Sequence, residues 1–93
     1  MHGEYKVPGG KLIVVDLETT NGTLSEVRVA GDFFLEPDEA LDRITQAIIG
    51  LPADSTAAQI EQAIQDALLP TDVLFGITPI GVAIAVRRAL GKA

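Results

Sequence analysis

The sequence contains no cysteine and no tryptophan, and it has only one histidine, His2. Without cysteine, the chain forms no disulfide, no thiolate nucleophile and no cysteine-ligated zinc site. A single histidine near a chain end, in a segment that we expect to fray, does not provide a Ser-His-Asp triad or a histidine-rich metal site. These absences argue against an independent enzyme, because few residues remain that perform covalent or metal-assisted catalysis.

Basic residues and long hydrophobic runs are scarce as well. Seven Lys and Arg stand against 13 Asp and Glu, which gives a net charge of -6. Such a chain repels phosphate backbones, so general nucleic-acid binding is not expected. No apolar run approaches the roughly 20 residues that span a bilayer, and the first residues lack the pattern of a signal peptide. We expect a cytoplasmic protein with neither a membrane nor a nucleic acid as partner.

Aliphatic residues are abundant by contrast. Hydrophobic residues make up 47% of the chain although aromatic residues make up only 4%. This composition predicts a folded chain, and its length predicts a single domain, residues 1–93. A domain of this size buries only roughly 60 to 65% of the surface that its unfolded chain exposes. We therefore expect modest stability unless a partner covers more of the surface.

Two neighbouring segments predict a β-hairpin. Residues 11–19, KLIVVDLET, are rich in apolar and β-branched side chains, as strands are. Asn21-Gly22 is a pair that tolerates positive φ at both positions, as a two-residue type I′ turn requires. Residues 23–31, TLSEVRVAG, then alternate between apolar and polar side chains.

Three helices are expected after the hairpin. The first has Pro37 at its first helical position and ends near Gly50, and the second follows a capping box that starts at Thr56. The third begins at Thr78-Pro79 and is apolar nearly all round, which suggests deep burial or a subunit contact. Between them, residues 72–76, DVLFG, form a short strand or an extended connector. The pattern predicts an α+β fold, a small sheet built on a β-hairpin with about three helices packed on one face.

The stretch KVPGGK, Lys6 to Lys11, places two lysines around a tight turn in an acidic chain. Pro8-Gly9 suits the central positions of a type II turn. A tight reversal makes Lys6 and Lys11 near cross-strand neighbours, and an anion such as phosphate or carboxylate would relieve their repulsion. Gly9 and Gly10 let a ligand approach the backbone closely. The alternative is a solvated turn whose lysines keep an edge strand soluble.

A second conspicuous stretch is GDFFLEPDEA, residues 31–40. In an extended backbone, the adjacent Phe33 and Phe34 point to opposite sides, so one ring reaches the core and the other a different surface. An exposed ring there is a candidate anchor for a partner protein. The alternative is a strand-to-helix corner in which both rings pack internally. The carboxylates of residues 36–39 are typical of a first helical turn rather than of a metal site.

These stretches, together with FGITP at residues 75–79, resemble the C-terminal accessory domain of lipoate-protein ligases, which in some ligases is a separate short polypeptide. The similarity extends from Lys6 to about Leu90. Asp38 departs from the family pattern, which has glutamate there. The matching residues are Lys6, Pro8, Gly9, Gly10 and Lys11 in the first motif, Gly31, Asp32, Phe33 and Phe34 in the second, and Pro37 after it.

The resemblance implies a non-catalytic accessory subunit that is inactive alone and forms a heterodimer with a large catalytic subunit. That subunit makes lipoyl-AMP from lipoate and ATP with magnesium, and then transfers the lipoyl group to a lysine of a carrier protein. ATP, lipoate and magnesium are expected in the partner, and no cofactor in this chain. Residues 6–11 are expected near the adenylate, and residues 31–34 with Pro37, or the third helix, at the partner interface.

Two other functions remain open from the sequence. A stand-alone interaction module would bind another protein without any role in adenylation, and its lysine pair would be dispensable. A small-ligand regulatory domain would form a homodimer and bind a metabolite without a catalytic partner.

Overall fold

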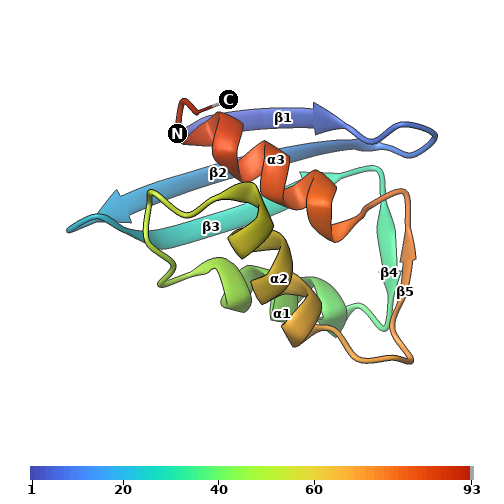
Figure 1. Cartoon of the computed structure of the whole chain (residues 1–93). Helices are drawn as coiled ribbons and strands as arrows, with labels where there is room; N and C mark the ends of the chain where they lie inside the picture. Colours follow the sequence, from blue (N-terminus) through green and yellow to red (C-terminus); the bar gives the residue numbers. More distant parts are fainter. Residues whose placement is uncertain (93) are drawn as a thin grey trace.

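A computed structural model describes residues 1–92 and shows an α+β fold (Figure 1). The elements in chain order are β1 (His2–Lys6), β2 (Leu12–Thr20), β3 (Thr23–Gly31), β4 (Phe34–Glu36), α1 (Glu39–Ile48), α2 (Ala57–Ala67), β5 (Val73–Phe75) and α3 (Pro79–Ala89). The first three strands form an antiparallel sheet in the order β1-β2-β3. The last two strands form a separate antiparallel ribbon. The expected α+β class is therefore confirmed, although its strands divide between two sheets.

The hairpin of β2 and β3 forms as the sequence predicts. Asn21 and Gly22 have φ of 53° and 79°, which are the positive values that a type I′ turn requires. Along β2 the burial alternates, so that Ile13, Val15 and Leu17 are buried and face the helices. Because the pleat turns the intervening residues the other way, the second face of the sheet carries the charged side chains.

The N-terminal segment is a strand, and the expectation that it frays is wrong. His2 lies opposite Asp16 in the register of β1 and β2, and the amino group of Met1 donates a hydrogen bond of 2.9 Å to the carbonyl of Leu17. Gly3 is buried beneath α3, where a Cβ would overlap the backbone nitrogen of Ala89. The absence of a side chain therefore lets β1 lie directly against the helix.

The first helix starts later than the sequence predicts. Pro37 is not its first residue, because the chain is still extended at Glu36, which pairs with Val73 of β5, and the helix begins at Glu39. The predicted N-termini of the second and third helices, α2 and α3, are confirmed. The Thr56 side chain accepts a hydrogen bond from the backbone N–H of Gln59 in a complete capping box, and the Thr78 hydroxyl accepts one from Gly81.

The hydrophobic core lies between the three-stranded sheet and the helices. Helix α3 packs on β1 and β2, α1 lies against β3, and α2 contacts both other helices. Within α3 only Ile80 and Arg88 are exposed, so burial in the domain accounts for the apolar character of this helix. Among residues 1–92, no helix is both long and apolar enough to cross a membrane. The largest fully buried side chains are Ile13, Leu24, Ile44, Ile48, Ile60 and Ile64.

Candidate functional site

The turn of residues 6–11, hereafter the KVPGGK turn, connects β1 to β2 at the end of the molecule where β4 and β5 lie (Figure 1). The backbone N–H of Gly10 donates to the carbonyl of Val7 at 2.8 Å, which closes a four-residue turn around Pro8 and Gly9. Gly9 has a φ of 73°, as the third position of a type II turn demands. The expected turn type is therefore confirmed.

The two lysines of the turn are not cross-strand partners. Lys6 lies opposite Leu12, and the bond from the Val7 N–H to the Lys11 carbonyl, 3.1 Å, sets Lys11 beside Val7 instead. The Lys6 ammonium bends back and donates to the carbonyl of Val7 at 3.0 Å. The expected repulsion between directly opposed lysines is thus absent, and its relief cannot be the reason for binding an anion.

The KVPGGK turn is fixed to the segment that follows β5. The Lys11 N–H donates to the carbonyl of Gly76 at 3.0 Å, and Gly76 itself has a φ of 80°. A Cβ at Gly10 would lie 3.0 Å from that same carbonyl, so the two backbones approach more closely than most side chains permit. A depression of about 220 Å³ lies at this junction, and it is lined by Val7, Pro8, Gly9, Gly10, Leu74, Gly76, Ile77 and Thr78.

The charge and the donors of the turn suit an anion better than a cation. Pro8 and Gly9 are exposed, and so are both lysines. Within residues 1–92, no hydrogen bond or ion pair engages the Lys11 ammonium, whereas that of Lys6 is partly occupied by a carbonyl. Ammonium groups act as mobile point charges that offset phosphate or carboxylate charge. The turn supplies such charge but no nucleophile and no general base.

The residues of the second motif occupy different environments. Phe33 is half-buried and packs against the core, whereas Phe34 is 54% exposed, so the two rings do point to different surroundings. Gly31 is the last residue of β3, and a Cβ at this position would overlap the carbonyl oxygen of Leu12. Asp32 and Pro37 are both exposed.

Phe34 stacks on a residue that was not among the expected site residues. Its partner is Phe75, directly opposite in the β4–β5 register, with ring centroids 4.3 Å apart and an angle of 15° between the rings. Phe75 is 40% exposed and Val73, two residues earlier on the same face of β5, is 44% exposed. The signal in the sequence was the spacing of two in DVLFG, which places residues 73 and 75 on one strand face.

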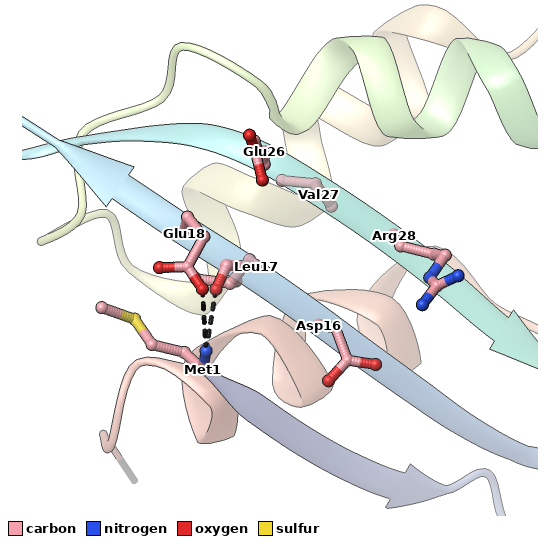
Figure 2. A pocket seen from close by; sticks show the side chains of 7 residues that line it. All are labelled: Met1, Asp16, Leu17, Glu18, Glu26, Val27 and Arg28. Carbon is pink, nitrogen blue, oxygen red and sulfur yellow. Dashed lines mark hydrogen bonds and ion pairs between the residues drawn. The ribbon is translucent and has the colours of Figure 1, made fainter.

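A larger hollow of about 420 Å³ lies on the open face of the sheet, at the opposite end from the KVPGGK turn (Figure 2). The Met1 amino group lies 3.6 Å from the Glu18 carboxylate, and Asp16 bonds to His2 at 2.8 Å. Arg28 adds a further positive charge. Its lining carries three carboxylates, those of Asp16, Glu18 and Glu26, against two positive groups, Arg28 and the Met1 amino group. This mixture of charges does not single out a ligand of either sign. Nor do residues 1–92 bring together three His, Asp or Glu side chains that could hold a metal ion.

The fold is an α+β arrangement that recurs in a known structure. It is similar to a chain in a solved structure of an archaeal lipoylation system from Thermoplasma acidophilum, a bi-partite lipoate protein ligase and its E2 lipoyl domain. The TM-score is 0.75, the sequences are 22% identical, and the match covers 94% of this chain and 93% of that chain. At this identity the likeness shows a shared fold. No protein-family model and no curated protein matches the sequence.

Proposed function

We propose that this chain is the non-catalytic accessory subunit of a two-component lipoate-protein ligase. It acts together with a large catalytic subunit, which binds ATP, lipoate and magnesium and makes lipoyl-AMP before the lipoyl group passes to a carrier-protein lysine. The observation that carries the proposal is the likeness of fold, over 94% of this chain, to a chain from a bi-partite lipoate protein ligase system. The KVPGGK and GDFF motifs, which resemble those of the ligase accessory domain, support it independently.

The KVPGGK turn is the element that we assign to adenylation. Its two lysines, Pro8 and Gly9 are exposed, it contains no carboxylate, and its bond to Gly76 fixes its backbone on the domain. A turn whose backbone is held in this way can border the nucleotide site of the large subunit and present its exposed lysines to the charge that develops there. In this proposal the turn offsets charge on the ATP phosphates or on the acyl-adenylate.

Lys11 is the residue from which we expect the larger effect. Replacing Lys11 by Ala should lower the adenylation rate of the complex by about 10- to 100-fold, since one charge-assisted contact realised in the transition state contributes that much. Lys6→Ala should have a smaller effect, because the Lys6 ammonium already donates to the Val7 carbonyl. Lys92→Ala, an exposed lysine near the C-terminus, is the matched control. Equal adenylation rates for the Lys11 and Lys92 variants would contradict the placement of the turn at the adenylate site.

The experiment that tests the function itself is ATP- and lipoate-dependent pyrophosphate release by the cognate large subunit. We expect release when both chains are present and little from either alone. Equal release by the large subunit with and without this chain would exclude the accessory role.

A stand-alone protein-interaction module is the second candidate, and the exposed stack of Phe34 and Phe75 favours it. This alternative requires a partner protein but no adenylation. A partner that binds tightly while pyrophosphate release is independent of this chain would favour it over the accessory subunit.

A further inference from the structure

The exposed side of the β4–β5 ribbon, here called the aromatic face, consists of Phe34, Phe75, Val73 and Glu36. These four residues share one side because Phe34 lies opposite Phe75, and Glu36 opposite Val73, in the antiparallel register. The opposite side of the ribbon carries Leu35, which is 4% exposed and belongs to the core. The aromatic face is thus a distinct apolar surface on a strand pair whose other side packs into the core.

Three contacts hold this ribbon rigidly. Leu35 anchors β4 in the core. The carboxylate of Asp72, immediately before β5, receives two hydrogen bonds from Arg43 of α1, at 2.5 and 2.9 Å. At the other end of β5, the Gly76 carbonyl accepts the bond from Lys11. Because the rings are already stacked on a rigid support, a partner that covers them gains apolar contact at little cost in side-chain entropy.

The charge around the aromatic face indicates the chemistry of its partner. The four exposed carboxylates of residues 32–39 belong to Asp32, Glu36, Asp38 and Glu39, and no Lys or Arg lies in that segment. On the side formed by residues 32–39 the border of the aromatic face is acidic, whereas the lysines of the KVPGGK turn lie beyond Gly76 on another side. The acidic side fits a partner surface that is apolar at its centre and carries Lys or Arg at the matching edge. A second copy of this chain is disfavoured, because each copy carries a net charge of -6.

We propose that the aromatic face is the docking surface for the large catalytic subunit, at an apolar patch bordered by basic side chains; this rests on the accessory role proposed above. The docked face positions the KVPGGK turn, because Phe75 is directly followed by Gly76, whose carbonyl holds Lys11. Docking and adenylation are thus assigned to neighbouring but separate groups. The phenylalanines bind the partner, and the lysines act on the reaction.

The test measures the affinity of the intact chain for the cognate large subunit by calorimetry, together with pyrophosphate release at saturation. Phe34→Ala and Phe75→Ala should each weaken binding at least about 30-fold, as central aromatic anchors do. When each variant chain is present at a concentration that saturates the large subunit, most of the wild-type pyrophosphate release should return. Leu69→Ala is the matched control, since Leu69 is as exposed as Phe34, 54%, but lies outside the aromatic face. Glu36→Lys, which leaves the rings intact, should also weaken binding and should reduce its dependence on salt.

The outcomes separate the two proposals. If wild-type chain and large subunit form an active complex whose affinity is unchanged by Phe34→Ala and Phe75→Ala, the docking surface is wrong and the accessory role stands. If the wild-type chain does not bind the large subunit, both proposals fail. Sedimentation of this chain alone gives a further check, because a wild-type dimer that Phe34→Ala dissociates would assign the face to a second copy.

Discussion

Gly3 shows how much one missing side chain determines in this protein. A Cβ at this position would overlap backbone atoms of α3, at Ala89 and Ala85, which have no rotamer with which to move aside. We expect Gly3→Ala to lower the free energy of unfolding by about 1 to 3 kcal/mol, since overpacking against a fixed neighbour forces a backbone shift. Glu26→Ala, an exposed change on β3 of the same sheet, should stay within about 0.5 kcal/mol. Equal midpoints of urea unfolding for the two variants would contradict the close packing of β1 on α3.

His2 makes the stability of the same strand depend on pH. Its ring bonds to the carboxylates of Glu4, at 2.7 Å, and Asp16, at 2.8 Å, and these bonds raise the pKa of His2 above 6.5. The protonated ring is therefore favoured in the folded state. The stabilisation of the fold by protonated His2 is fully present below pH 6.5, the unfolded pKa, and is lost as the pH rises through the higher folded pKa. A nuclear magnetic resonance titration should find the pKa above 6.5, and a value at or below it would contradict these contacts.

The elements differ in how far the sequence alone specifies them. The hairpin and the second and third helices carry local signals, namely Asn21-Gly22, the capping box at Thr56 and the Thr78-Pro79 start, and all three are confirmed. The strands β1 and β4 were not predicted. Each is short. β4 is defined by its pairing with β5, which follows two helices later in the chain, and β1 by its pairing with β2 across the KVPGGK turn. Local periodicity encodes neither pairing. The late start of α1 follows from the same cause, because pairing with β5 keeps the chain extended through residue 36.

An ion pair between Arg43 of α1 and Asp72, the residue before β5, links these two elements. The pKa of Asp72 is lowered to about 2, first by the hydrogen bonds from Arg43 and then by the backbone N–H of Leu69. Because the pKa of Asp72 is lower in the folded state, the ionised carboxylate stabilises the fold. This stabilisation is present above pH 3.8, the unfolded value, and is lost as the pH falls towards 2.

We therefore expect Asp72→Asn to be less stable than the wild type at neutral pH, and the difference to shrink as the pH falls below about 4. Asp54→Asn, in an exposed loop, is the matched control. Urea unfolding at several pH values measures both variants. If the two asparagine variants lose the same stability at neutral pH, the ion pair does not hold β5 on α1.

At the scale of the whole molecule, one end of the fold gathers the features that we assign to function. The KVPGGK turn is near the N-terminus and the β4–β5 ribbon is built from two later segments, yet the bond from Lys11 to Gly76 joins them (Figure 1). The sequence alone indicated the turn and Phe34. It did not indicate that Phe75 covers Phe34, because two helices separate β4 from β5 in the chain. Nor did it indicate that Lys6 lies opposite Leu12, because this pairing depends on the register that the loop between β1 and β2 sets.

The most direct test of the proposed role compares the two half-reactions of the ligase. Lipoylation of the acceptor by the large subunit should be measured from ATP and lipoate, and again from preformed lipoyl-AMP, each with and without this chain. We expect the chain to be required when ATP and lipoate are supplied and to have little effect when lipoyl-AMP is supplied. A chain that is dispensable in the first reaction, or equally required in both, would contradict a role in adenylation.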